Sequence, residues 1–560
     1  MGFLGILEDH QLAHVPGTVI LNEQQAHSEN LTAGLKHGSG KNSHIVLAPQ
    51  PSEDPNDPLN FSTTRKAIIL SICGFGTILC AATLGPLLNA GLAVIAADFG
   101  KPIRDITLVS GYQLLVVGAS GPFVCAFSRK WGKRPVFLFS SLSALIGTII
   151  GSATNDYGGF LASRVVQGLS ASAYESLIIA VIGDLYFVHE RGFYMAIIQF
   201  FTGAVSNFSS VICGPITTGL GWKYLFHIFI AFISFQLILL FFFVPETSYS
   251  RDRRYEIDEL AADDLGGLAA VERKHTTAQR VEQATDVQLE TIPTKTSVLS
   301  PPVPPKKTFR QSLAIVTGTH SGESLFQLVV SPFAVCSNVF IFWVVAVTGT
   351  MTALYVAVAF DLAQIFSPPP YGLSAAGVGY LSVGPFIGGL LASVLMLFIN
   401  DPMIKWATRK NKGVYEPEYR LLPMVGGLLA GAGLMGFGVV AQTLGSYYAA
   451  STLHGLALFG IIVVAVAGAN YALDAYRDMS SEIFIAAMMF KNFLFYGMSY
   501  FINNWTADAG PEQVFYALGG VAFGLTLTTV PVFIYGKRYR SFWNRHNVLE
   551  KLHIRTHSEI

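Results

Sequence analysis

Twelve apolar runs, each long enough to cross a bilayer as a helix, constrain this chain more than any other feature. A helix needs about 20 apolar residues to span roughly 30 Å of hydrocarbon, and in lipid it satisfies its own backbone hydrogen bonds. The alternating pattern of a membrane β-barrel does not occur in the sequence. The sequence therefore predicts an all-α membrane protein with twelve transmembrane helices, at about residues 67–95, 106–127, 135–153, 160–182, 194–218, 222–244, 332–360, 374–399, 421–442, 446–474, 482–504 and 513–535.

Composition excludes several other classes of protein. Only 13% of the 560 residues are charged and 51% are hydrophobic, whereas soluble proteins carry about 25% charged residues. The 36 basic residues balance the 36 acidic ones, which argues against a nucleic-acid binder. The five cysteines lie far apart in apolar runs, without the spacing of a disulfide framework or a zinc site. We expect no nucleic-acid partner, no metal and no cofactor.

Enzyme and pump motifs are also missing from the sequence. HGSGKNS (37–43) has Leu35 where a phosphate loop needs its first glycine, and Asn42 where it needs serine or threonine. No nucleophile elbow or catalytic triad order stands out. We therefore expect neither an enzyme nor an ATP-driven pump.

Basic residues predict which side of the membrane each loop occupies. Only Lys101, Arg104 and Lys223 fall in the loops on one side, whereas the termini and the loops on the other side carry nearly all the rest. Because positive residues stay inside, both termini are predicted to be cytosolic. Asp361 is assigned to the external side. The first 64 residues lack a signal-peptide pattern, so the first span is expected to serve as the insertion signal.

The spans divide into two groups of six around a long polar segment. That segment mixes both charge signs and contains SPPVPP (300–305), which is typical of a flexible tether; a regulatory docking site is the alternative. The basic stretches SRKWGKRP (128–135) and KWATRKNKG (405–413) occupy corresponding loops of the two groups. Two halves that rock about a central site are predicted. The predicted parts are a cytosolic tail 1–64, a six-helix half 65–244, a linker 245–331, a second half 332–536 and a cytosolic tail 537–560.

Several motifs carry a resemblance to a known family. DPNDPLNFSTTRK precedes the first span, GKRP follows the second, RVVQG lies in the fourth, and GPITTGLGW ends the fifth. NKGVYEPEYRL and YALDAYR mark the second half. These segments resemble the major facilitator superfamily, and within it the fungal twelve-span subgroup of drug:proton antiporters and cation or polyamine permeases. One departure is Arg129, where the family's loop usually has an acidic residue.

The resemblance implies a monomeric, proton-coupled carrier of a small molecule in the plasma membrane. Three functions remain open. The glycine-proline motif of the fifth span favours efflux of a drug, toxin or secondary metabolite by rocking-bundle alternating access. The motifs of the second half favour uptake of a cation or polyamine. A receptor or scaffold that moves nothing is the third possibility.

Three ionisable residues inside predicted spans are candidates for proton coupling. Arg164 and Glu175 are eleven residues apart, which places them on one face of the fourth span but too far apart to pair directly. Lys491 lies near the middle of the eleventh span. Because a charged side chain in a span is costly, we expect these groups to face the bundle interior or a wet cavity. Glu175 is predicted to bind the coupling proton, with a structural salt bridge as the alternative.

Other residues are candidates for the substrate cavity or for gating. Polar or aromatic side chains within spans could line the cavity, although ordinary interhelical hydrogen bonds explain many of them: Tyr112, Gln113, Gln167, Gln199, Asn338 and Trp343. Charged residues at the cytosolic mouth and small residues on the fifth span are candidates for gating. The alternatives are retention of the loops inside by positive charge, pairing of Asp184 with Arg191 at the rim, and tight helix packing. The gating candidates are Arg129, Lys130, Gly132, Lys133, Arg134, Asp184, Arg191, Gly214, Pro215, Asp474 and Arg477.

Overall fold

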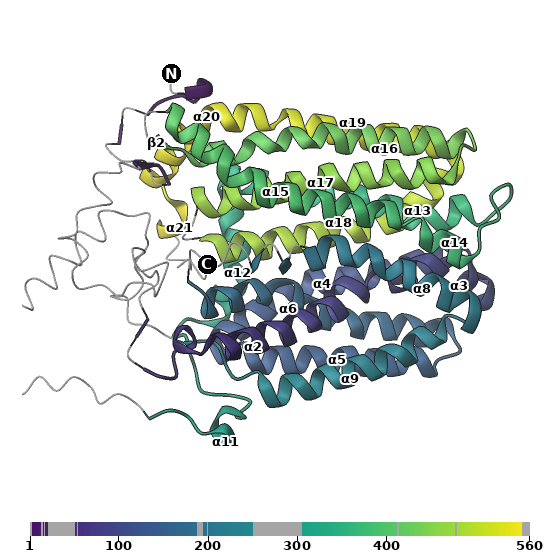
Figure 1. The fold of residues 1–560 in the computed structure, drawn as a ribbon, viewed down its shortest axis with the longest axis horizontal. Coiled ribbons are helices and arrows are strands. Elements are labelled where there is room, and N and C mark those ends of the chain that lie inside the picture. The colour runs from purple at the N-terminus through teal and green to yellow at the C-terminus, as the bar shows by residue number, and fades with distance from the viewer. Residues whose placement is uncertain are drawn as a thin grey trace, which may run out of the picture.

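The computed structural model contains a single bundle of long, roughly aligned helices (Figure 1). It describes residues 3–9, 11, 12, 15, 17–20, 51, 52, 54–187, 194, 195, 197, 198, 200–249, 305–411, 414–476 and 479–551. Within these ranges eleven helices are long and apolar enough to cross a membrane. The predicted all-α membrane fold is confirmed.

The first half of the bundle contains the helices before the polar segment. Its first span is broken, because Pro86 cannot continue the hydrogen-bond ladder of the helix before it. The elements are η3 (Pro58–Asn60), α2 (Thr63–Gly76), the π-helical η4 (Thr77–Thr83), η5 (Pro86–Gly91), α3 (Leu92–Phe99), α4 (Ile103–Trp131), α5 (Lys133–Ala153), α6 (Tyr157–Leu185), η6 (Phe201–Val205), α8 (Ser206–Leu220) and α9 (Lys223–Phe243).

The second half is built in the same way from the helices that follow. Its elements are α12 (Leu325–Ala334), η8 (Val335–Ser337), α13 (Val339–Phe366), α14 (Ala375–Tyr380), α15 (Val383–Lys410), η9 (Pro417–Gly426), α16 (Gly427–Gln442), α17 (Tyr447–Ala475), α18 (Ser480–Ala509), α19 (Pro511–Leu527) and α20 (Thr529–Arg545). Outside the two halves lie η1 (Phe3–Gly5), β1 (Val19–Ile20), α11 (Phe309–Ser312), β2 (Val414–Tyr415) and α21 (Val548–Lys551).

Two details differ from the predicted spans. The predicted fifth span, 194–218, includes residues 196 and 199, which lie outside the described residues. In its described part lie η6 and α8, which are rich in serine, threonine and glycine and are not among the eleven long apolar helices. The predicted seventh span ended at 360, but α13 continues to Phe366 and so contains Asp361. That residue is therefore not in an external loop: it is buried and accepts hydrogen bonds from Thr506 Oγ1 at 2.5 Å and Asn503 Nδ2 at 3.2 Å.

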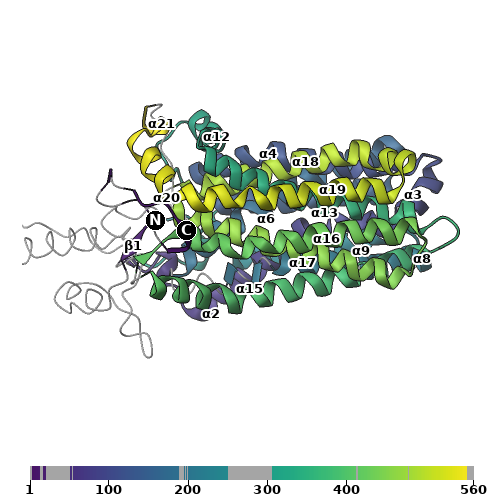
Figure 2. The same cartoon turned by 90° about the horizontal axis from the view of Figure 1, so that it is seen from above.

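Elements from both ends of the sequence meet at one end of the bundle. η1, β2, α20 and α21 lie there, whereas α3 and α14 lie at the opposite end (Figures 1 and 2). β1 pairs antiparallel with β2, with Val19 opposite Tyr415. We call these the terminal end and the distal end. Most of the predicted linker, residues 250–304, is outside the described residues, but its last part contains α11 and the start of α12.

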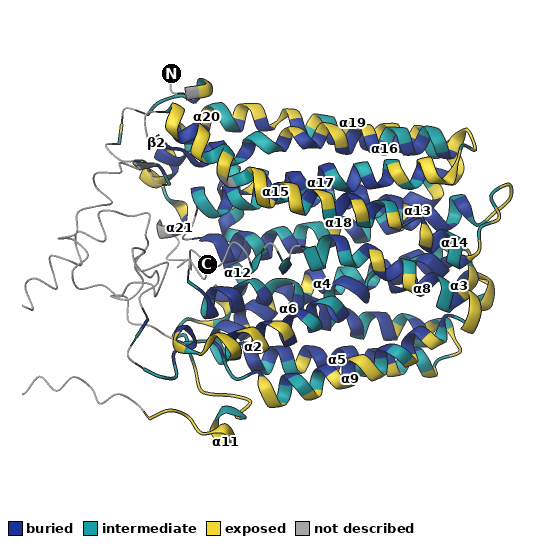
Figure 3. Ribbon diagram, in the orientation of Figure 1, coloured by how far each residue is buried: buried dark blue, intermediate teal, exposed yellow. Residues whose placement is uncertain are grey.

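Burial follows the pattern expected of helices in lipid. Large apolar side chains such as Phe139, Phe232 and Phe398 are more than 45% exposed on the outside of the bundle, and the faces turned inward are buried (Figure 3). In water this much exposed apolar surface would be unfavourable, but lipid covers it. The core between the helices also contains buried polar and charged groups, which mark where function is to be sought.

A buried ion cluster at the terminal end ties the beginning of the chain to the second half. Arg540 donates to Glu418 at 2.9 and 3.1 Å and to Glu416 at 3.1 Å. Lys537 Nζ lies 2.6 Å from Glu416 and 2.6 Å from Glu8. The N-terminal segment was predicted only as a polar tail, so this docking was not expected from the sequence.

Candidate functional site

A cavity of about 380 Å³ lies between the two halves of the bundle. Its walls come from η5, α4, α6 and α8 on one side and from α13, α17 and α18 on the other. Two lining residues, Ala472 and Ile483, lie near the terminal end of the bundle: each is within one turn of the point where α17 ends or α18 begins. The volume is within the range of sites that hold small organic molecules.

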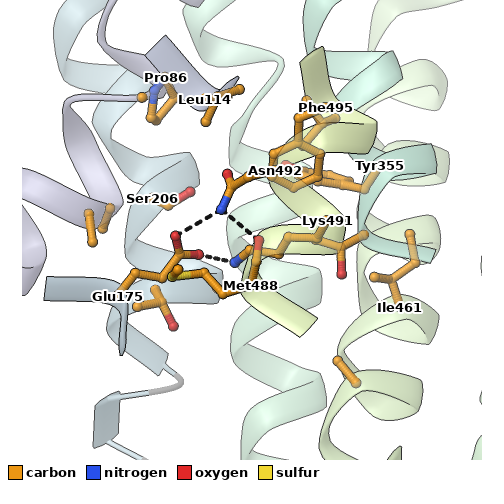
Figure 4. Close-up of a pocket in the computed structure, with 18 of the residues that line it drawn as sticks. Pro86, Leu114, Glu175, Ser206, Tyr355, Ile461, Met488, Lys491, Asn492 and Phe495 are labelled. Atoms are coloured by element: carbon orange, nitrogen blue, oxygen red, sulfur yellow. Dashed lines mark hydrogen bonds and ion pairs between the residues drawn. The ribbon is translucent and has the colours of Figure 1, made fainter. Parts of the chain in front are cut away.

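The charged residues among the described lining are Glu175 and Lys491. Glu175 comes from α6 in the first half and Lys491 from α18 in the second, and their side chains form a direct ion pair (Figure 4). Asn492 Nδ2 donates to the other carboxylate oxygen of Glu175 at 3.2 Å and to Met488 O at 2.9 Å. The pair thus connects the two halves, while Asn492 orients the carboxylate. The two side chains are 20% and 26% exposed, so both remain accessible from the cavity.

Arg164 shares a face with Glu175 but does not line the cavity. It is fully buried and donates to the carbonyl oxygens of Leu84 at 2.8 Å and Gly85 at 3.2 Å, and to Gln167 Oε1 at 2.9 Å. These carbonyls lie at the break between η4 and η5, where Pro86 removes a helical donor. Arg164 therefore stabilises the broken first span, and any effect on the cavity passes through Gly85, which lines it.

Of the predicted cavity side chains that the structure describes, Gln113 lines the cavity. Tyr112 instead packs on Tyr496, with ring centroids 5.4 Å apart. Gln167 binds Arg164 and Thr148, Asn338 caps the start of α13, and Trp343 Nε1 donates to Thr528 in a groove beside α20. These four side chains contact other partners in this structure, because helical periodicity does not fix which neighbour a polar face meets. Gln199 lies outside the described residues.

The basic loop after α4 makes specific contacts rather than a loose positive cluster. Arg129 Nη1 lies 2.8 Å from Glu482 Oε1 and so links the two halves, and Lys133 Nζ lies 2.7 Å from Asp184 Oδ2. Asp184 therefore has Lys133 as one partner, and Arg191, its expected partner, lies outside the described residues. Lys130 Nζ donates to Glu323 O at 3.4 Å.

Gly132 and Arg134 meet a carboxylate that the sequence did not single out. Gly132 has φ +99°, and a Cβ there would lie 2.1 Å from Glu246 Oε2. Glu246 accepts from the backbone N–H groups of Lys133 at 2.9 Å and Arg134 at 3.1 Å, so it caps the start of α5. Arg134 Nη2 donates to Phe241 O at 2.7 Å. The loop is thereby fixed to the end of α9.

Asp474, which was predicted to belong to a charge cluster at the end of α17, contacts Arg420 of η9 and Tyr415 of β2. Arg420 Nε lies 2.6 Å from Asp474 Oδ2, which also accepts from the Tyr415 hydroxyl. Burial, with the negative charge of Asp474, raises the pKa of Tyr415 well above its usual value, so this phenol stays a hydrogen-bond donor. Arg477 lies outside the described residues.

Gly214 and Pro215 lie where α8 crosses α14 near the distal end. A Cβ on Gly214 would lie 2.5 Å from Ala375 O, and one on Gly379 would lie 2.4 Å from Ser210 O. Ala376 N donates to Thr218 Oγ1 at 2.9 Å across the same contact. The two halves thus meet backbone to backbone here, beside Ser210 and Val378, which line the cavity.

We expect Gly214→Ala to loosen that distal contact, because backbone atoms of α14 cannot move aside as a side chain can. Overpacking of this kind costs about 1–3 kcal/mol. A cysteine placed at Ser382, which lines the cavity, should react faster with an impermeant thiol reagent from the distal side. Gly219→Ala is the matched control, since nothing lies within 4 Å of its Cβ position. Equal labelling rates in the two variants would show that the α8–α14 contact is not a seal.

Comparison with known proteins identifies relatives along most of the chain. Residues 70–493 match the family described as Major Facilitator Superfamily. Protein HOL1 of Saccharomyces cerevisiae is 23% identical over 97% of this chain and 98% of that protein. MFS transporter fsa7 of a Fusarium species is 26% identical over 87% of this chain and 88% of that protein. A partially occluded inward-open structure of the xylose transporter XylE from E. coli has the same fold, with a TM-score of 0.54 at 13% identity over 83% of this chain and 97% of that one.

Proposed function

The chain belongs to the major facilitator superfamily, and on that premise we propose that it is a proton-coupled efflux carrier for a largely apolar small molecule. It is a multi-pass membrane transporter of the secondary type. Its coupling ion, its cargo and the direction of transport are the proposed part. We further propose that the terminal end, where the basic loops lie, faces the cytosol and that the protein acts in the plasma membrane.

The observation that carries the proposal is the ion pair of Glu175 with Lys491 across the cavity. A carboxylate in this position can lose its cationic partner when it takes up a proton. Because the pair joins α6 to α18, its protonation would weaken a tie between the halves that must separate during alternating access. Proton binding and the rocking of the two halves would thereby be coupled at this ion pair.

The remaining cavity walls favour an apolar cargo. They are lined by side chains such as Leu114, Val344, Ile461 and Phe495, and the paired charges of Glu175 and Lys491 cancel. A multiply charged amine would need several carboxylates, whereas the described lining supplies Glu175. The narrower resemblance to drug:proton antiporters agrees with this cargo.

Uptake of a cation is the second candidate, and the cavity-lining carboxylate of Glu175 favours it. A cationic cargo could replace Lys491 at this carboxylate and so form the same kind of ion pair. The resemblance of NKGVYEPEYRL and YALDAYR to cation and polyamine permeases points the same way.

Flux measurements in proteoliposomes with an imposed pH gradient separate these functions. Radiolabelled cycloheximide and fluconazole serve as uncharged probes and radiolabelled spermidine as the polycation. Movement of an uncharged probe opposite to the proton gradient supports efflux by antiport. Spermidine movement along the proton gradient supports the second candidate. Absence of flux for all probes by folded protein would contradict both and leave a receptor or scaffold.

A further inference from the structure

A second polar group lies in the cavity wall apart from the ion pair. His454, on α17, lines the cavity and is 1% exposed. Neither ring nitrogen has a hydrogen-bond partner among the residues that the structure describes. Leaving a buried polar group unpaired costs about 1–3 kcal/mol, so a cargo atom that formed a hydrogen bond with one of these nitrogens would be favoured.

Aromatic neighbours hold the imidazole ring in a fixed plane. Tyr355 stacks on it with ring centroids 5.0 Å apart and an angle of 28° between the planes. Phe437 packs against it with centroids 5.9 Å apart. Since these contacts occupy apolar surface of the ring, its polar edge is what remains for a hydrogen bond.

The stacked tyrosine links this place to the other half of the bundle. The hydroxyl of Tyr355, on α13, donates to Asn207 Oδ1 on α8, and Asn207 Nδ2 donates to Gly203 O at 2.8 Å. Tyr355 and Asn207 also line the cavity. Three neutral polar side chains from both halves are thus gathered in its wall, separate from the charged pair.

We propose that Asn207, Tyr355 and His454 form a neutral subsite that hydrogen-bonds a hydroxyl or carbonyl group on an otherwise apolar cargo. His454 is the residue that contacts the cargo and determines specificity. An uncharged imidazole presents one donor and one acceptor, so a hydroxyl group can satisfy it and a methyl group cannot. A site built for a hydrogen bond discriminates against the analogue that lacks it, because its own polar atoms then stay unpaired. This inference rests on the proposed apolar cargo and narrows its chemistry.

Binding of two nearly isosteric probes tests the subsite. The purified full-length protein is titrated with 1-naphthol and with 1-methylnaphthalene, and affinity is obtained from the rise in thermal stability with ligand concentration. We expect 1-naphthol to bind about fivefold more tightly, since one hydrogen bond separates the two probes. His454→Phe keeps an aromatic ring but removes both nitrogens, and it should abolish this preference. His454→Asn keeps a donor and an acceptor and should restore part of it.

Two further variants make the result specific to this place in the cavity. His227→Phe is the control: it makes the same substitution at an exposed residue of α9 and should keep the preference for 1-naphthol. Glu175→Gln tests the competing place, because it removes the cavity carboxylate and shows whether the hydroxyl group of the probe binds there instead. The proposal is overturned if the wild-type protein binds both probes equally, if His454→Phe keeps the preference, or if Glu175→Gln alone abolishes it. This binding is measured without a proton gradient. A negative result would therefore contradict the subsite, whereas the proton coupling and the direction of transport are tested by the flux measurements.

Discussion

Glu175→Gln should make transport insensitive to an imposed pH gradient, because a carboxamide cannot take up or release the coupling proton. The ion pair with Lys491 would become a hydrogen bond from the lysine ammonium to an uncharged amide in every step of the cycle. We expect accumulation of cargo against its gradient to fall about tenfold or more, equivalent to at least about 1.4 kcal/mol of lost coupling. Exchange of cargo at equal concentrations, which needs no proton movement, should persist.

The measurement is flux in proteoliposomes with and without a pH gradient, for the wild type and the variant side by side. Glu512→Gln, in the first turn of α19, makes the same chemical change outside the cavity lining and should leave the pH response intact. Normal pH-driven accumulation by Glu175→Gln would remove this residue from the coupling mechanism.

Arg540→Met should be the most destabilising single substitution at the terminal end. Arg540 is 2% exposed and is the cation that contacts the fully buried carboxylate of Glu418. Removal of one partner of a buried ion pair leaves an uncompensated charge and costs about 3–5 kcal/mol. The docking of the N-terminal segment should weaken as well, because Arg540 also lies 3.4 Å from Thr18 Oγ1.

Unfolding in mixed micelles by titration with SDS gives the free energy of unfolding for this test. Arg538→Met is the matched control: the residue is exposed on the same helix and donates to the backbone oxygen of Glu8. It should change stability by no more than about 0.5 kcal/mol. Adding Glu418→Gln to Arg540→Met should recover part of the loss, since the orphaned charge is then gone. A stability of Arg540→Met equal to that of the control would show that the cluster contributes nothing.

Features that depend on local composition were predicted well from the sequence. The length of an apolar run decides whether a helix can cross lipid, so the all-α membrane fold followed directly. The cost of burying a charge singled out Glu175 and Lys491 before any contact was known. The fifth span was predicted at 194–218, and the described part of it contains η6 and α8, which are rich in serine, threonine and glycine.

Pairings between distant residues were decided by the tertiary structure. Glu175 and Lys491 are 316 positions apart, and Arg540 is 522 positions from Thr18. His454 was missed since a single histidine in an apolar helix gives no sign of which side faces a cavity. Gln167 and Trp343, which were predicted to line the cavity, contact Arg164 and Thr528 in this structure, and nothing in the sequence indicated these partners for the same reason. The sequence by itself determined which segments enter the membrane, because transfer into lipid depends on each segment's own side chains; packing of the helices decided which polar groups meet, because that depends on neighbours that no single segment encodes.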